Sequence, residues 1–271
     1  MSRFSYYPPI LGYHRIGAFT PPHGSPARQG GEEGIQTPKG NFQRPRPSDR
    51  GAGFTGGHVP SVSAELFERH LQWLTRFRCR VLSLDEALDC VDRGETLPRR
   101  SVVITFDDGY AETYSVAWPL LKRHGFPATV FIATEEVGWN GFLTWDQVAE
   151  IAGNGITIGS HTKHHTYLPL ASQNRLHEEL VDSKQTIESR LGRPIHFLSY
   201  PVGGFTLQVQ VLVKEAGYRA ACTTNRASPL GGIDRYALRR IKMTEHDVNP
   251  LFFCAKLSGY YNTFRQLKSP G

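Results

Sequence analysis

The chain has 271 residues, with 31 Lys and Arg against 25 Asp and Glu, which gives a formal net charge of +6. This length suits one large domain with a substantial core, and no apolar run of about eighteen residues predicts a membrane helix. The basic balance permits attraction to acidic glycans or cell-envelope surfaces, whereas no zinc-finger spacing, RNP pattern or glycine-rich phosphate loop indicates a nucleic-acid partner.

Apolar runs typical of strands alternate with helical stretches along the chain. Near the N-terminus, the run PPILGYHRI reads as a strand that ends at Tyr13 and His14. Further strands are expected at 80–83, 102–106, 128–132 and 156–159, with helices at 84–93, at 114–124 and from Thr144 onward. This alternation predicts parallel βαβ units, and polar residues at several strand ends favour an α/β fold of the distorted (β/α) barrel type.

One segment does not fit this pattern. Residues 17–60 are crowded with Gly, Pro, Ser and Arg and contain few large aliphatic side chains. Such a composition cannot bury enough apolar surface to offset the entropy of ordering. We therefore expect a single catalytic domain over 1–271 with a flexible loop insertion at 17–60. Because the insertion begins just after His14, we expect a partly ordered flap that shapes substrate access, in preference to an inert insertion.

An apolar, β-branched run ends abruptly in two carboxylates. The sequence VVITFDDGY spans 102–110 and places Asp107 and Asp108 at the end of a strand that is short enough to be internal to a parallel sheet. Two adjacent aspartates repel each other unless a cation or hydrogen bonds stabilise them. The pair therefore indicates a functional site at the end of this strand, although a solvated Asp-Asp-Gly turn is the alternative for this segment alone.

Three histidines follow the strand expected at 156–159. In SHTKHH, His161 and His165 stand four residues apart, and on a helical turn they would share one face while His164 pointed elsewhere. One aspartate with two histidines is a ligand set suited to zinc and tolerable to other first-row divalent ions. The spacing therefore predicts a metal site.

Together, TFDDG at 105–109 and SHTKHH at 160–165 resemble the first two motifs of the polysaccharide deacetylases, the NodB-homology or carbohydrate esterase 4 family. Their order and separation both match, and the resemblance spans about 61–241 plus the short N-terminal piece. It implies a barrel with fewer or less regular strands than a full eightfold one. It also implies a metal-dependent hydrolase that removes N-acetyl groups from amino-sugar residues of a poly- or oligosaccharide and releases acetate. The implied catalytic base is Asp107, and the implied ligands of the divalent ion, zinc before other metals, are Asp108, His161 and His165.

The N-terminal strand is similar to the opening of permuted family members, which include the poly-N-acetylglucosamine deacetylases. In that branch, a histidine near the chain start has the proton-donating role that a histidine on a late strand has in other members. The resemblance therefore implies that His14 protonates the leaving amine. A rival is His246, which lies late in the chain, and we favour His14 because its strand ends directly at it.

A third motif is present in altered form. LSYPVGG at 198–204 is similar to the S-Y-P-x-G version of the permuted branch, with Ser199 where other members have an arginine and Val202 where they often have an aromatic residue. The resemblance makes the backbone N–H of Val202 the candidate oxyanion donor. It also makes Arg240, in LRRI at 238–241, the candidate substitute for the missing arginine. The alternative for one of Arg239 and Arg240 is a solvent-facing charge.

Two other functions remain open at this stage. Fold and metal ligands do not determine the acyl group, so another metal-dependent amide hydrolase, such as a deformylase or a small-molecule amidase, is one alternative. A non-catalytic glycan-binding relative is the other.

The chain start lacks the apolar core of a signal peptide, so the expectation is a cytoplasmic protein or one whose export signal has been removed. The four cysteines show no C-x-x-C spacing, and we expect buried free thiols, at Cys90 and Cys254 in particular.

Overall fold

The computed structural model describes residues 7–17, 59, 61–224 and 234–258. Most of the expected insertion at 17–60 therefore lies outside the described residues. The strands are β1 (Ile10–Tyr13), β2 (Arg15–Ile16), β3 (Ser61–Val62), β4 (Arg80–Leu82), β5 (Ser101–Phe106), β6 (Ala128–Ile132), β7 (Ile156–Ser160), β8 (Phe197–Ser199), β9 (Ala220–Thr223) and β10 (Leu238–Lys242). The α-helices are α1 (Ala64–Arg76), α2 (Leu84–Asp92), α3 (Trp118–His124), α4 (Trp145–Gly153), α5 (Gln173–His177), α6 (Ser183–Leu191), α7 (Leu207–Glu215) and α8 (Pro250–Leu257). Shorter 3₁₀ or π turns are η1 (Thr113–Ala117), η2 (Leu168–Leu170), η3 (Glu178–Asp182), η4 (Pro201–Gly203) and η5 (Arg235–Ala237).

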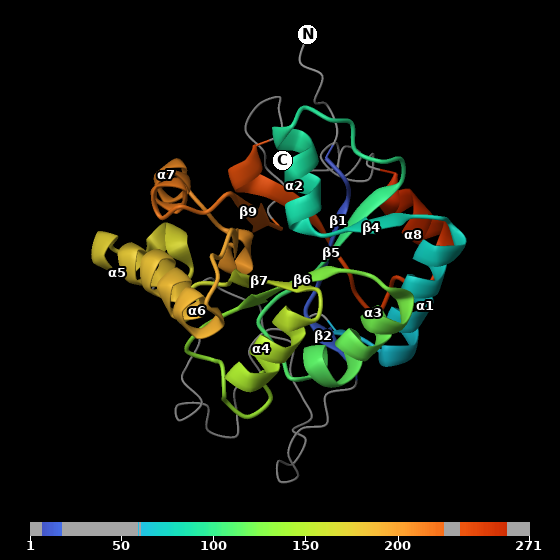
Figure 1. Cartoon of the computed structure of the whole chain (residues 1–271), viewed down its shortest axis with the longest axis horizontal. Coiled ribbons are helices and arrows are strands. Elements are labelled where there is room, and N and C mark those ends of the chain that lie inside the picture. The colour runs from blue at the N-terminus through green and yellow to red at the C-terminus, as the bar shows by residue number, and fades with distance from the viewer. Residues whose placement is uncertain (1–6, 18–58, 60, 225–233, 259–271) are drawn as a thin grey trace, which may run out of the picture.

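Seven parallel strands close into a barrel. The hydrogen-bonded order runs β1-β10-β9-β8-β7-β6-β5, and β1 also pairs with β5, which closes the ring. Strand β4 pairs with the first residues of β5 as an eighth member of the sheet, while β2 and β3 form a separate pair. The first strand of the chain thus lies between β5 and β10 (Figure 1). The predicted distorted (β/α) barrel is confirmed, with fewer closed strands than a full eightfold one.

Period-two alternation sorts the strand side chains between the two sides of the barrel wall. Glycine is required at one point of the interior, because a Cβ on Gly159 would lie 2.5 Å from the ring of Phe131 and 3.0 Å from the carbonyl oxygen of Phe197. One cluster of buried residues fills the interior, and its strand members are Ile10, Leu82, Val103, Phe131, Phe197, Ala220, Cys222 and Leu238.

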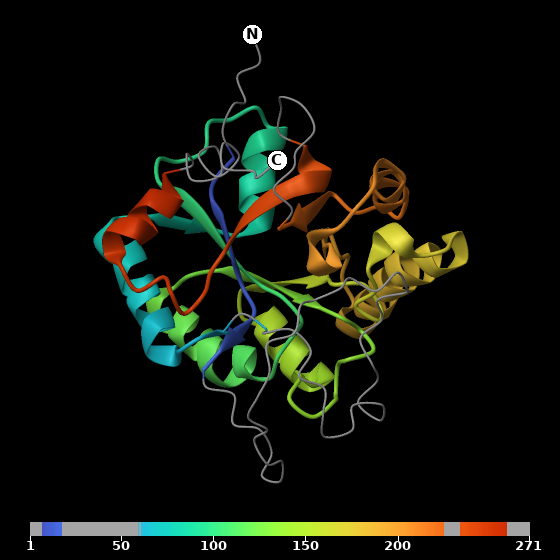
Figure 2. The ribbon, with the colours of Figure 1, turned by 180° about the vertical axis from the view of Figure 1, so that it is seen from behind.

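Helices surround the barrel and cover its outer face. Sequence signals explain where several begin: Ser83 and Thr144 each form a capping box with the residue three positions later, at the starts of α2 and α4. In both views α8 lies beside α1, where the His70 and Phe253 rings stack with centroids 4.8 Å apart (Figures 1 and 2). The helix expected at 114–124 begins instead as the π turn η1 and becomes α-helical only at Trp118.

Helix α2 lies at the amino-terminal ends of β8 and β9. Its residues Leu84, Ala87 and Leu88 join the interior cluster. Its polar face meets residues that directly precede these strands: Nδ1 of His196 lies 3.1 Å from Oδ1 of Asp85, and Arg219 pairs with several carboxylates of α2. The helix therefore covers the end of the barrel opposite the carboxyl ends of the strands.

None of the helices in the described ranges is long and apolar enough to cross a membrane. The four cysteines are free thiols, as expected. Cys222 is fully buried inside the barrel, whereas Cys90 and Cys254 are half-buried. The expectation of buried thiols at these two positions was wrong, because each lies on a helix at the protein surface rather than on a strand.

Candidate metal and catalytic site

Side chains capable of chemistry gather where the carboxyl ends of the strands meet. In a parallel barrel these ends share one face, so residues far apart in the sequence become neighbours there. The residues brought together are His14 after β1, Asp107 and Asp108 after β5, His161 and His165 after β7, Ser199 at the end of β8 and Arg240 in β10.

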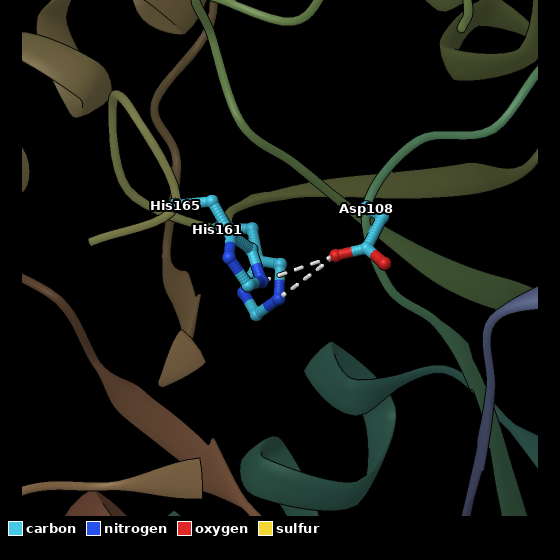
Figure 3. A group of neighbouring side chains, drawn as sticks. All are labelled: Asp108, His161 and His165. Carbon is cyan, nitrogen blue, oxygen red and sulfur yellow. Dashed lines mark ion pairs between the residues drawn. The ribbon is translucent and has the colours of Figure 1, made fainter. Parts of the chain in front are cut away.

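Asp108, His161 and His165 form a compact buried group with ligand atoms that all lie within 4.8 Å of one another. Oδ1 of Asp108 lies 3.4 Å from Nε2 of His161 and 3.2 Å from Nε2 of His165 (Figure 3). Zinc ligands at about 2.0–2.2 Å in a tetrahedral arrangement lie roughly 3.3–3.6 Å from one another. The spacing and chemistry of these donors therefore fit a divalent ion such as zinc.

The surroundings of His161 also favour a positive charge. Its Nδ1 lies 2.7 Å from the carbonyl oxygen of Ser199, which can only accept, so Nδ1 carries a proton and Nε2 is the nitrogen that faces Asp108. Burial alone lowers the pKa of His161, yet the charges of Asp107 and Asp108 together with these hydrogen bonds raise it above its usual value. A cation bound beside Asp107 and Asp108 would offset the same negative charge.

The segment that carries both histidines is not a helical turn. Residues 161–166 form an irregular loop, and Thr162 and His165 adopt the left-handed region with φ of 69° and 56°. The helical geometry expected for the four-residue spacing was therefore wrong, although the loop still turns both imidazoles toward Asp108 (Figure 3). The ring of His164 points elsewhere, with Nδ1 3.0 Å from Oε1 of Glu179.

Arg240 binds Asp107, the first of the two adjacent aspartates. Its Nη1 and Nη2 donate to the two carboxylate oxygens of Asp107 over 2.7 Å and 2.6 Å, and both side chains are almost fully buried. Nη2 also donates to Oγ of Ser199 over 2.9 Å, and Nη1 to Oγ1 of Thr105 over 3.3 Å. Burial alone raises the pKa of Asp107, but Arg240, with His161 and His14, lowers it to about 2. Asp107 is therefore an ionised carboxylate held in one orientation, while Arg239 is half-buried and does not contact it.

His14 lies beside Asp107, with Nε2 3.8 Å from Oδ2 and the side chain 18% exposed. Burial lowers the pKa of His14, although Asp107 and Asp108 act in the opposite direction. The strand is anchored one residue earlier: Nε2 of His70 donates to the carbonyl of Asp247, so its Nδ1 accepts from the Tyr13 hydroxyl over 3.0 Å.

His246 lies in an exposed turn after β10, and in the described part of the chain it has no interaction with this group. The structure thus brings His14 into the site and leaves His246 outside it.

Val202 lies at the tip of η4, which follows β8. It adopts a left-handed conformation with φ of 58°, and its side chain is 69% exposed. A β-branched residue in this region is a backbone outlier, and such strain is typical of functional sites. Asp108, Thr162 and His165 are positive-φ residues of the same face, so four of the six such non-glycine residues in the described ranges belong to the site or its loops.

Sequence reasoning missed three residues that support this arrangement. Ser199 was noted only as the place of a missing arginine, and Thr105 only as the first residue of the TFDDG motif, yet both accept hydrogen bonds from Arg240. Glu179 lies on η3 and binds the histidine loop. A signal for Thr105 exists in hindsight, because it is two residues before Asp107 and so shares its face of the strand. Glu179 has no comparable local signal.

Comparisons with known proteins agree with the fold and motifs. The model of the polysaccharide deacetylase family matches residues 94–221. YxkH of Bacillus subtilis (strain 168), named as a polysaccharide deacetylase, is 30% identical over 190 residues, which cover 70% of this chain and 68% of that protein. The chain belongs to the polysaccharide deacetylase family. The resemblance inferred from the two motifs is therefore confirmed.

Other deacetylases are similar over comparable lengths. The poly-beta-1,6-N-acetyl-D-glucosamine N-deacetylase of Staphylococcus aureus (strain MRSA252) is 27% identical over 199 residues, which cover 68% of each chain. Among solved structures, the Streptococcus pyogenes deacetylase PplD in complex with acetate superposes with a TM-score of 0.74 at 23% identity, covering 93% of this chain and 99% of that one. IcaB from Ammonifex degensii gives a TM-score of 0.67 at 22% identity, covering 92% and 97%. At identities this low, the structural matches show a shared fold alone.

Proposed function

We propose that this member of the deacetylase family hydrolyses the N-acetyl groups of amino-sugar residues in a poly- or oligosaccharide, with release of acetate. The observation that carries the proposal is the arrangement around Asp107. An ionised carboxylate, oriented by Arg240, lies beside the three proposed metal-ligand residues, with Nε2 of His14 3.8 Å from its Oδ2. This combination supplies a base, an acid and a cation site within one buried group.

In the proposed mechanism, Asp108, His161 and His165 hold the ion, with zinc favoured by the mixed nitrogen and oxygen donors. When bound, such an ion polarises a carbonyl and lowers the pKa of water. Asp107 takes the proton of the attacking water, a task for which its carboxylate is already ionised. Arg240 keeps both oxygens of that carboxylate in position, so its direction is set before substrate binds.

The second half of the reaction needs a proton for the departing amine. His14 is the proposed donor, because its Nε2 lies 3.8 Å from Oδ2 of Asp107 and can therefore take up the proton that Asp107 removes from water and pass it to the amine. The N–H of Val202 is the proposed partner of the oxyanion of the tetrahedral intermediate, a role supported by the strained turn that carries it. The products are acetate and a free amino group on the sugar.

The glycan substrate is supported by the names of the relatives, several of which are poly-beta-1,6-N-acetyl-D-glucosamine N-deacetylases. The test is release of acetate from β-1,6-linked N-acetylglucosamine oligomers, measured with and without a chelator and after zinc is restored. A formylated amine and a small acetamide serve as parallel substrates. Activity on either of these alone would indicate a different amide hydrolase, and oligomer binding without acetate release would indicate a non-catalytic glycan-binding protein.

A further inference from the structure

The loop at 161–166 carries two of the three metal-ligand residues yet belongs to no helix or strand. Thr162 and His165 both adopt left-handed backbone conformations, which cost free energy in residues other than glycine. Such a conformation persists only where the surroundings enforce it. The groups that hold this loop therefore decide whether the imidazole of His165 reaches Asp108.

A single buried carboxylate makes most of these contacts. Glu179 has no exposed surface, and its Oε2 accepts from the backbone N–H groups of Lys163 and His164 over 2.8 Å and 2.9 Å. Its Oε1 accepts from Oγ1 of Thr166 over 2.6 Å and lies 3.0 Å from Nδ1 of His164. The carboxylate thus binds the loop immediately before and immediately after His165, without contacting that residue itself.

The helix that carries Glu179 is firmly tied to β7. The π turn η3 interrupts the helical stretch between α5 and α6, which lies beside β7 (Figure 1). Oγ of Ser183 donates to the carbonyl of Glu179 and lies 2.9 Å from Oγ of Ser160, the last residue of β7. Nη2 of Arg175 pairs with Oε1 of Glu179 over 2.9 Å and offsets its buried charge. Glu179 is therefore a fixed reference point for the loop.

We propose that Glu179 is a positioning residue that holds the loop in its metal-binding conformation and thereby sets the affinity of the site for zinc. The proposal rests on the proposed function only in taking Asp108, His161 and His165 as the metal site. The partners of the Glu179 carboxylate are Lys163, His164, Thr166 and Arg175, and none of these belongs to the three proposed metal-ligand residues. Its effect passes through the backbone before His165 and through the side chain of Thr166 after it.

The test compares Glu179→Gln with Glu178→Gln as a matched control. Glu178 precedes Glu179 on the same turn and also pairs with Arg175, but it meets only the side chain of Lys163, not the loop backbone. The zinc dissociation constant is measured by competition with a chelating dye, and the cobalt-substituted protein is examined by visible absorption. We expect Glu179→Gln to weaken zinc binding by about 10–100-fold, the range for partners that orient metal ligands, and to weaken the cobalt absorption as His165 leaves. The control should stay within about twofold.

Thr166→Val provides a milder version of the same test if Glu179→Gln fails to fold. It removes one hydrogen bond to the carboxylate without leaving a buried charge unpaired, and we expect a several-fold weaker zinc affinity with unchanged thermal unfolding of the metal-free protein. Unchanged zinc affinity in a folded Glu179→Gln, or in Thr166→Val if the former does not fold, would overturn the proposal. Failure of the unmodified protein to bind zinc or cobalt would instead overturn the metal site itself, and with it the proposed function.

Discussion

The molecule contains two arginine–aspartate clusters of the same chemistry in opposite settings. At the carboxyl ends of the strands, Arg240 grips Asp107 with side chains only 1% and 3% exposed. At the amino ends, Arg219 pairs with Asp89 and Asp92 of α2 over 2.8 Å and 3.0 Å, with side chains 30%, 47% and 37% exposed. The hydrogen-bond lengths are therefore similar in the two clusters. The clusters differ in how deeply their side chains are buried.

This difference assigns the clusters different roles. Water screens the exposed cluster, so its arginine contributes little to stability and mainly holds α2 near the start of β9. The buried pair is shielded from water, and removing one partner leaves a charge that cannot be solvated. The same burial lets Arg240 control the protonation of Asp107, which directly precedes the first of the three proposed metal-ligand residues.

The largest effect is expected from removing the base. Asp107→Asn keeps the shape of the side chain but loses the basic oxygen, so we expect kcat for acetate release to fall by about 10²–10⁴-fold. Zinc content should remain near one per chain, because Asp107 is not among the three proposed ligand residues. Parallel loss of zinc and activity would place Asp107 among the ligands and contradict the division of work between the two aspartates.

The second effect concerns His14, the proposed proton donor beside Asp107. His14→Ala should lower kcat by about 10²–10⁴-fold, since the leaving amine loses its acid, while zinc affinity stays unchanged. His246→Ala is the control and should be near neutral, because His246 lies in an exposed turn. The reverse pattern in the two variants would contradict the assignment of the acid to the N-terminal strand.

Breaking the buried pair should destabilise the fold. Arg240→Met removes the partner of a buried carboxylate, and we expect the free energy of unfolding at neutral pH to fall by about 3–5 kcal/mol, measured in urea. Acetate release should also fall, because Asp107 loses its fixed orientation. A loss below about 1 kcal/mol would mean that water reaches the carboxylate despite its burial.

The loss of stability in Arg240→Met should depend on pH in a definite direction. In the unmodified protein the pKa of Asp107 is lowered to about 2, so its contribution to stability is present above its ordinary pKa and disappears as the pH falls toward 2. Without Arg240, burial instead raises the pKa of Asp107, and the folded state then holds a proton that the unfolded state releases. The destabilisation by Arg240→Met should therefore be smaller at pH 5 than at pH 7. A pH-independent difference would show that Arg240 does not control this carboxylate.

The smallest effect is expected at the exposed cluster. Arg219→Met should lower the free energy of unfolding by about 0–1 kcal/mol, and the loss should shrink at high salt. Arg240→Met should be almost insensitive to salt, because its pair is buried. Equal salt dependence in the two variants would contradict the distinction drawn between the two ends of the barrel.

Much of the fold could be read from the sequence because its signals are local. The apolar runs at 102–106, 128–132 and 156–159 are short, β-branched and buried, and each became a strand within one or two residues of the expected bounds. The helix starts at Ser83 and Thr144 follow from capping residues that act within one turn. The adjacent aspartates and the clustered histidines resemble two motifs of the family, and each motif is a short run of neighbouring residues that can be read without the fold.

Tertiary structure decided how these residues meet. Arg240, not Arg239, reaches Asp107 because the pairing of β10 with β1 and β9 sets which alternate residues face the barrel interior, and a one-residue shift would exchange them. His165 faces Asp108 through a left-handed loop that the distant Glu179 holds, so neither a helical period nor local propensity describes it. The sequence by itself determined which chemical groups stand at the strand ends. Sheet register and long-range hydrogen bonds determined their distances, because both depend on segments that are neighbours only in the folded chain.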